Sequence, residues 1–198
     1  MIGNEFIKMY WSYYLVLESD LSSIEQYVSF DKKNYKCFSN EFVKLYQAIC
    51  SEFDVVCREY CNHINNGNTK KMNIYDYKNH IIKKHSEITK EKILFVPNNE
   101  WIQPFDNWNN ESPSWWIQYN LVKHSRTALL KNKYNYENAN LENAIYSLAA
   151  LYIIEKYFYN DLSNNKADAK TIPLSRVLPK SSLFGFLNSE NDCLFVTC

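Results

Sequence analysis

Apolar side chains recur at three- and four-residue steps along residues 5–29, and this spacing constrains the fold most strongly. The period is that of one face of an α-helix, so the segment predicts a long first helix. Its stripe consists of Phe6, Met9, Tyr10, Tyr13, Leu17, Leu21, Ile24 and Val28. The same pattern returns in residues 39–64, 74–86, 113–131 and 141–159. The sequence therefore predicts an all-α bundle of four to five helices.

Composition supports long helices in one principal domain. Only 3 glycines and 5 prolines occur among 198 residues, which argues against a turn-dense sandwich or barrel. A chain of this length buries roughly 70% of the surface that it exposes when unfolded, which is enough for one core. We assign residues 1–162 to the helical bundle domain and 163–198 to a C-terminal tail. Short apolar runs at 182–187 and 193–197 predict a small β-hairpin appendage in that tail.

Helix starts can be read from capping residues. Ser39 is a favourable N-cap, and Glu41 lies in the first turn, where it complements the helix dipole. Ser112 supplies a capping hydroxyl before Pro113, a residue favoured at the first helical position. We therefore expect one long helix to begin after each serine.

The segment between the short third helix and the next long helix lacks a helical period. Ile93–Val96 is a short apolar run that predicts an extended piece, and residues 98–112 are predicted to be irregular. Long irregular segments in compact domains are functional or are held by their own side chains. Trp101, Phe105 and Trp108 favour the second reading, with an exposed stacking surface as the alternative.

Charge and hydropathy limit the classes of function. The 22 basic and 22 acidic residues cancel, so any contact with nucleic acid must come from a local patch. Few glycines leave no Gly-rich phosphate loop, which disfavours nucleotide hydrolysis. The longest apolar run, Ala144–Ile154, is too short to span a bilayer, and the N-terminus lacks a signal-peptide pattern. We expect a cytoplasmic protein without membrane contact.

The cysteines do not form a metal motif. Cys50, Cys57 and Cys61 follow one helical face, and no close Cys-x-x-Cys pair accompanies them. Buried reduced thiols are the interpretation that this spacing favours. We expect neither a metal nor another cofactor.

A polar constellation lies on the helix predicted over residues 113–131. Asn120, His124 and Thr127 share one face, at i, i+4 and i+7. Apolar residues occupy most other directions, so this helix is expected to be buried. With Lys123 and Arg126, the constellation offers an imidazole and two cations that could hold a phosphodiester and move a proton. The alternative is a buried network in which the cations pair with carboxylates such as those of Glu18, Glu52 and Asp54.

The segment Tyr119–His124 resembles the motif of the HEPN superfamily of helical bundles. That motif is an arginine, a polar residue that is often asparagine, three variable residues and a histidine. Asn120 and His124 are in register, whereas Tyr119 occupies the arginine position. A longer pattern, covering roughly residues 10–160, resembles a group of bacterial proteins. Its matching pieces are Ser114–Trp116, Tyr119–Arg126, Ala139–Leu141 and Ile49–Val56.

The resemblance implies metal-independent RNA cleavage by a homodimer, in bacterial stress or phage defence. His124 would be the general acid or base, and Asn120 would orient His124 or a phosphate oxygen. Arg126 or Lys123, at positions that differ from the family's pattern, would take over the stabilisation of charge on phosphorus. We expect substrate contacts from Lys123, Tyr119 and Trp116, and supporting contacts from Glu52 and Asp54.

Two alternatives remain open. Tyr119 in the arginine position favours a catalytically inactive HEPN-like module that binds RNA, a nucleotide or a partner, or that dimerises. A scaffold is the other alternative, with the tryptophan-rich segment Trp101–Trp116 as its interface. Cleavage of RNA in EDTA would distinguish the enzyme from both.

Overall fold

The computed structural model describes residues 3–67, 71–164 and 180–186, and every structural statement below concerns these residues. The first long helix is built from α1 (Gly3–Phe6), the π-helical turn η1 (Ile7–Trp11) and α2 (Ser12–Ile24). The predicted first helix is confirmed, although it ends at Ile24 instead of near residue 29. Its buried side includes Phe6, Trp11 and Leu17, three apolar residues that point toward the other helices.

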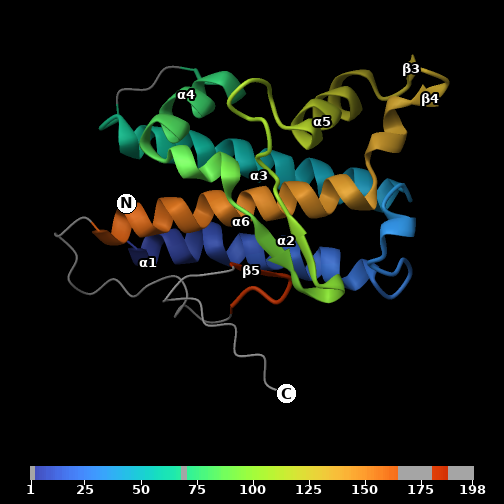
Figure 1. Ribbon diagram of the computed structural model, residues 1–198, viewed down its shortest axis with the longest axis horizontal. Helices are drawn as coiled ribbons and strands as arrows, with labels where there is room; N and C mark the ends of the chain where they lie inside the picture. The colour runs from blue at the N-terminus through green and yellow to red at the C-terminus, as the bar shows by residue number, and fades with distance from the viewer. Residues whose placement is uncertain (1–2, 68–70, 165–179, 187–198) are drawn as a thin grey trace.

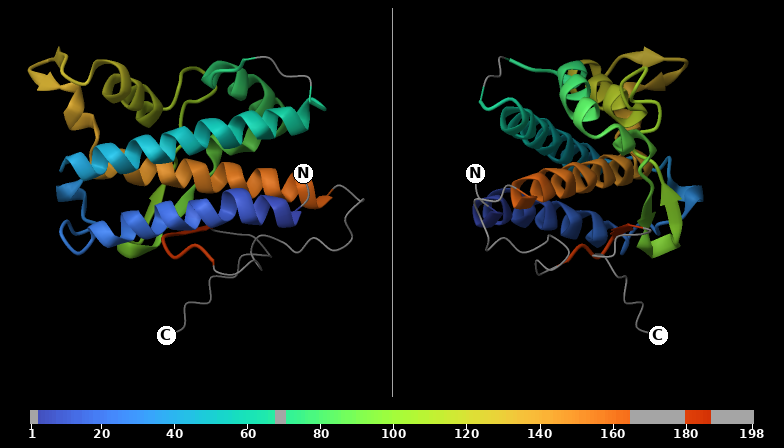
Figure 2. Two further views of the ribbon diagram at one scale, coloured as in Figure 1. Left: turned by 180° about the vertical axis from the view of Figure 1, so that it is seen from behind. Right: turned by 60° about the vertical axis from the view of Figure 1, so that its left-hand side comes forward.

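Two further long helices complete the central layer. These are α3 (Asn40–Ile64) and α6 (Leu141–Asn164). The predicted cap of α3 is confirmed, since the Ser39 hydroxyl accepts a hydrogen bond of 3.2 Å from the Phe42 amide. In Figure 1, α6 lies between α3 and the α1–α2 helix. The short helices α4 (Ile74–Lys84) and α5 (Ser114–Ser125) pack on the outer side of α3, as both views in Figure 2 show.

Aromatic side chains and small thiols fill the space between these helices. Phe6 and Tyr60 pack against Phe158, with ring centroids 5.3 and 4.9 Å apart. Cys50, Cys57 and Cys61 are buried free thiols, as predicted. Most residues of α6 are buried, as expected for a helix that lies between two others.

A small antiparallel sheet crosses one side of the bundle. It consists of β1 (Ile93–Phe95), β2 (Glu100–Ile102) and β5 (Phe184–Phe186), in the order β2-β1-β5. The extended piece predicted at Ile93–Val96 is confirmed. The expectation of an irregular segment from 98 to 112 is wrong at its start, because β2 forms there and pairs with β1. The turn η4 (Val96–Asn98) and the left-handed Asn99 (φ 55°) make that pairing possible.

The C-terminal strand pairs differently from the predicted hairpin. The apolar run at 182–187 does contain β5, but β5 pairs with β1, and Ile93 lies opposite Phe186. The second run, at 193–197, lies outside the described residues. Glu18 of α2 accepts hydrogen bonds from the Ser182 amide, the Ser182 hydroxyl and the Leu183 amide. Residues 180–186 therefore pack as part of the bundle.

The fourth predicted helix ends earlier than expected. It was predicted to reach Lys131, yet α5 ends at Ser125 and a two-stranded hairpin follows, β3 (Leu129–Leu130) and β4 (Lys133–Tyr134). Lys131 and Asn132 have φ angles of 53° and 62°, the signature of a type I′ two-residue turn. The expected Ser112 cap is also wrong by one position, because Pro113 is the N-cap and no side chain caps the helix.

Short 3₁₀ turns connect the remaining elements, and α4 confirms the short helix predicted from residue 74. These turns are η2 (Lys32–Asn34), η3 (Ser86–Lys90) and η5 (Asn135–Asn138). The capping box at the start of α4 joins the Asn73 side chain to the Tyr75 amide and the Asp76 side chain to the Asn73 amide. None of the helices in the described ranges combines the length and the apolar character needed to cross a bilayer.

Candidate functional site

The helix that carries the predicted constellation lies on the surface of the bundle with one face packed. Its buried residues are Trp115, Trp116, Tyr119 and Val122, which follow the helical period. Ile117 on the opposite side is 41% exposed. The expectation that this helix is enclosed on all sides is therefore wrong. Its apolar outer residues face solvent because α5 belongs to the outermost layer (Figure 1).

Trp115 and Trp116 hold α5 against α3. The indole Nε1 of Trp115 donates to the Pro104 carbonyl at 2.8 Å, which ties the preceding irregular segment to the helix. The Trp116 ring lies 5.6 Å from Phe53, and Trp116 is only 8% exposed. An indole packed in this way offers almost no face for a nucleobase. The predicted substrate contact by Trp116 does not fit this position.

Tyr119, which occupies the arginine position of the HEPN motif, is a core residue. It is 4% exposed, and its ring packs against Tyr46 at 6.0 Å. Burial raises the pKa of its phenol, and the nearby Lys123 ammonium acts in the opposite direction. The Lys123 Nζ lies 5.3 Å from the Tyr119 ring centroid, a cation–π contact. Tyr119 thus orients Lys123 from within the core, and its predicted direct contact with a substrate does not fit.

Asn120 and His124 differ in exposure although they share a helical face. The Asn120 amide donates to the Trp116 carbonyl at 3.0 Å and is half-buried. His124, one turn later, is exposed to solvent. The imidazole is therefore reachable from outside the protein, and no described side chain encloses it. One N–H of the Asn120 amide is bonded to the helix backbone, so its predicted orienting role would have to come from the second N–H or from the carbonyl oxygen.

Arg126 begins the exposed segment that leads into the β3–β4 hairpin. We call residues 123–134 the basic arm. It contains Lys123, His124, Arg126, Lys131 and Lys133, and of these only Lys133 is partly covered. No acidic residue occurs between Glu111 and Glu137 in the sequence. Within the described ranges, none of the arm's lysines or its arginine forms an ion pair.

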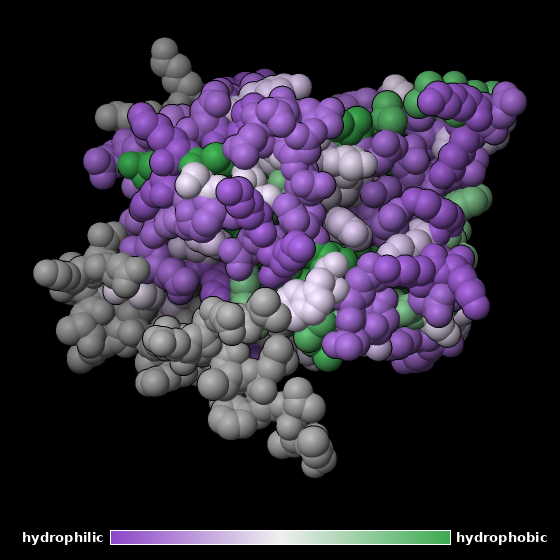
Figure 3. Space-filling view, viewed as in Figure 1, coloured by the Kyte–Doolittle hydropathy of each residue, from purple (hydrophilic) through white to green (hydrophobic). Residues whose placement is uncertain are grey.

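The arm is held in place from its C-terminal side. The Asn135 side chain donates to the Ser125 carbonyl at 2.9 Å, and the Tyr136 amide donates to the Arg126 carbonyl at 3.0 Å. These bonds satisfy carbonyls that the end of α5 would otherwise leave without a partner. Leu129 (62% exposed) and Tyr134 (50% exposed) accompany the cations. At the corner where Figure 1 places β3 and β4, Figure 3 shows apolar and hydrophilic surface side by side.

The two carboxylates predicted to support the site lie elsewhere. Asp54 accepts a hydrogen bond of 2.8 Å from the Tyr77 hydroxyl and forms an ion pair with Arg58. Glu52 acts electrostatically on Glu155 of α6, and burial raises its pKa. Neither carboxylate contacts His124 or Arg126. Asp54 is thus a structural ion-pair residue, but its partner is Arg58 and not Lys123 or Arg126, the cations that the alternative interpretation of the sequence named.

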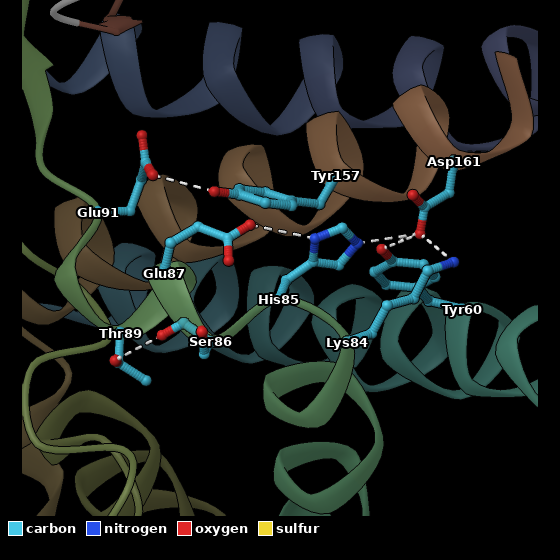
Figure 4. Close-up of polar contacts among 9 residues, drawn as sticks. All are labelled: Tyr60, Lys84, His85, Ser86, Glu87, Thr89, Glu91, Tyr157 and Asp161. Carbon is cyan, nitrogen blue, oxygen red and sulfur yellow. Dashed lines mark hydrogen bonds and ion pairs between the residues drawn. The ribbon is translucent and has the colours of Figure 1, made fainter. Parts of the chain in front are cut away.

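A second polar cluster, which the sequence analysis missed, joins α4 to the end of α6 (Figure 4). Asp161 lies at its centre, 2.7 Å from the Lys84 Nζ and 3.1 Å from the His85 Nε2, and it also accepts a hydrogen bond from the Tyr60 hydroxyl. We call these four residues the Asp161 clasp. No local sequence pattern predicts the clasp, because its members come from three helices and from the residue that follows α4.

The chemistry of the clasp is structural. The other imidazole nitrogen of His85, Nδ1, lies 3.1 Å from a Glu87 carboxylate oxygen, so both ring nitrogens face acids. Burial of Asp161 acts to raise its pKa, but the hydrogen bonds from Lys84, Tyr60 and His85 outweigh it, and the net pKa is lowered. Tyr60, Lys84 and His85 all contact the same Asp161 oxygen, Oδ2, so the described contacts of the clasp join helices to one another.

Among the polar residues predicted from the sequence, those of the basic arm are exposed to solvent. Of the eight predicted site residues, the structure brings together His124, Lys123 and Arg126 on one exposed surface, with Asn120 beside them. It places Trp116, Tyr119, Glu52 and Asp54 in the core or in structural contacts. Comparison with protein-family models, with curated proteins and with solved structures finds no match to this chain.

Proposed function

We propose that this protein binds RNA and that the basic arm contacts its phosphate backbone. The observation that carries the proposal is the exposed run of cations from Lys123 to Lys133, without an acidic residue or an ion pair in the described structure. Basic side chains on a neutral protein need a reason to be concentrated in this way. Phosphate contacts by Lys and Arg supply most of the affinity of non-specific nucleic-acid binding.

The neighbouring side chains favour a single strand over a duplex. Tyr134 is exposed at the end of the hairpin, close to Lys133 in the chain, and offers an aromatic face on which an unpaired base can stack. Lys123 and His124 lie in the last turn of α5. These basic residues offset the negative end of the helix dipole, which would otherwise repel an approaching phosphate. A short protruding hairpin thus supports contact with a flexible strand.

The HEPN-like relationship is part of the same proposal. Asn120 and His124 keep the spacing of that family's motif at the base of the arm. Burial of Tyr119 in the arginine position favours a binding module without cleavage. Cleavage is the second candidate, and the observation that favours it is the solvent-exposed His124 imidazole beside two cations.

Binding is tested by the salt dependence of affinity. Anisotropy of a short labelled single-stranded RNA is measured with wild type, with a Lys131→Ser/Lys133→Ser variant, and with a Lys36→Ser/Lys44→Ser control. The control removes the same charge from lysines already paired with Glu142 and Glu41. Each lost phosphate contact should reduce the slope of log K against log salt by about 0.7. Equal slopes for the arm variant and wild type would overturn the proposal.

Cleavage is tested separately with the same RNA in EDTA. Cutting by wild type that is lost in His124→Ala, with the helical circular dichroism unchanged, would establish the second candidate. Binding without cutting would establish the inactive module. A protein that does neither but forms dimers would favour the scaffold interpretation, and analytical ultracentrifugation measures this directly.

A further inference from the structure

Glu155 of α6 is a buried acid without a hydrogen-bond partner. Its side chain is 0% exposed, and neither carboxyl oxygen is bonded to any described residue. The other deeply buried glutamate, Glu18, differs because one of its oxygens accepts three hydrogen bonds from Ser182 and Leu183. Buried polar groups are nearly always paired, so an isolated carboxyl in the centre of a helical bundle calls for a reason.

The charged group that acts on Glu155 from α3 is another acid, which does not neutralise a negative charge. Glu52 of α3 acts on Glu155, and the phenol of Tyr10 in η1 is influenced by Glu52, Glu59 and Glu155 together. Lys156, the next residue, lies 3.4 Å from the Phe186 ring centroid on the side of the sheet. Lys8 of η1 is exposed to solvent. The junction is therefore acidic and lacks a described cation.

A metal ion does not explain this junction. The described residues contain no group of three or more His, Cys, Asp or Glu side chains placed to hold one. A proton is the simplest occupant, because a neutral carboxyl avoids the large free-energy cost of an unpaired charge in the interior. Burial, and then the charge of Glu52, raise the pKa of Glu155 well above its ordinary value.

We propose that Glu155 is a proton-binding site that controls how tightly α6 packs against α3 and η1. With its proton bound, the carboxyl is neutral and the three elements pack closely. When Glu155 loses the proton, its unpaired carboxylate is repelled by the charge of Glu52, and the N-terminal helix packs less tightly against α6. The π-helical turn η1 contacts α6 on both sides of Glu155, because the Trp11 ring lies 6.0 Å from Tyr152 and the Tyr10 ring lies 6.5 Å from Phe158. Turns of this kind occur frequently at functional sites.

The direction of the pH dependence follows from linkage. Glu155 binds its proton more tightly in the folded protein than in the unfolded chain. Its contribution to stability is therefore complete below the unfolded pKa, near 4.3. It is lost progressively as pH rises toward the folded pKa. Within this window one extra proton is bound by the folded state, so the unfolding constant rises about tenfold per pH unit.

The test compares wild type with Glu155→Gln, which keeps the shape and cannot ionise. Urea unfolding followed by tryptophan fluorescence gives the unfolding constants at successive pH values above about 4.3. The ratio of the wild-type constant to the Glu155→Gln constant should rise about tenfold per pH unit and then level off. Glu142→Gln, on the same helix but ion-paired at the surface, is the control and should give a flat ratio. A flat ratio for Glu155→Gln would overturn the proposal.

A second variant keeps the inference testable if Glu155→Gln does not fold. Glu52→Gln removes the neighbouring charge that disfavours ionisation of Glu155. The folded pKa of Glu155 should then fall, so the unfolding constant of Glu52→Gln should stop rising at a lower pH than that of wild type. If both proteins level off at the same pH, the two carboxyls are not coupled and the proposed site is wrong.

Discussion

The His85 Nε2 lies 3.1 Å from the Asp161 Oδ2, although the two residues are 76 positions apart in the chain. This contact joins the end of α4 to the last turn of α6. Lys84 and Tyr60 bind the same carboxylate, so Asp161 collects three donors from two other helices and from the residue after α4. The clasp links the end of α4 to α3 and α6, and α4 lies in the same outer layer as α5.

Removal of the central carboxylate should destabilise the bundle. Asp161→Asn removes the negative charge that Lys84 and His85 contact and replaces one carboxylate oxygen by an NH2 donor, and we expect the free energy of unfolding to fall by about 1–3 kcal/mol. Glu87→Gln is the matched control, because Glu87 meets the other nitrogen of His85 but is 56% exposed. That substitution should cost less than about 1 kcal/mol. If urea unfolding gave the same loss of free energy for Asp161→Asn and Glu87→Gln, the clasp would stabilise the protein no more than an exposed contact does.

The contact between His85 and Asp161 predicts that the protein loses stability in acid. The pKa of Asp161 is lower in the folded protein than in the unfolded chain, because its hydrogen bonds outweigh the effect of burial. Its contribution is thus present above the unfolded pKa, near 3.9, and is lost as pH falls through the folded pKa. The stability difference between wild type and Asp161→Asn should be constant near neutral pH and should shrink below about pH 4. A difference that persists unchanged in acid would contradict this.

Glu18 should anchor the strand β5 to the helical layer. Glu18→Leu removes the acceptor for the Ser182 and Leu183 amides, and we expect a loss of about 1–3 kcal/mol. Hydrogen–deuterium exchange of the peptide containing residues 180–186 should rise while exchange in α3 stays low. Ser182→Ala removes only the hydroxyl contact and should have a smaller effect. Unchanged exchange in Glu18→Leu would mean that pairing with β1 alone holds the strand.

The indole of Trp115 should stabilise the segment that leads into α5. Trp115→Phe keeps an aromatic ring but removes the donor to the Pro104 carbonyl, at an expected cost of about 1–3 kcal/mol. In a protein of this size that loss lowers Tm by roughly 2–4 °C per kcal/mol. Trp101→Phe, at a 39% exposed position, should change Tm little. Similar shifts for both variants would show that ring size, and not the hydrogen bond, matters.

Much of the candidate site could be located from the sequence, but its composition could not. The position of His124 and its neighbouring cations followed from helical spacing. Which face of α5 is buried did not, because apolar residues occupy most directions of this helix until α3 is placed beside it. The acid-free stretch between Glu111 and Glu137 was readable, and it is the signal that would have identified the arm.

By itself, the sequence determined the helices of this protein and where most of them begin. Apolar spacing and capping residues such as Ser39 act between neighbours in the chain, so their outcome needs no knowledge of the rest. Only the tertiary structure decided that β5 pairs with β1 and that Asp161 meets His85. These outcomes depend on contacts between segments far apart in the chain, whose free energy exists only after the helices have packed.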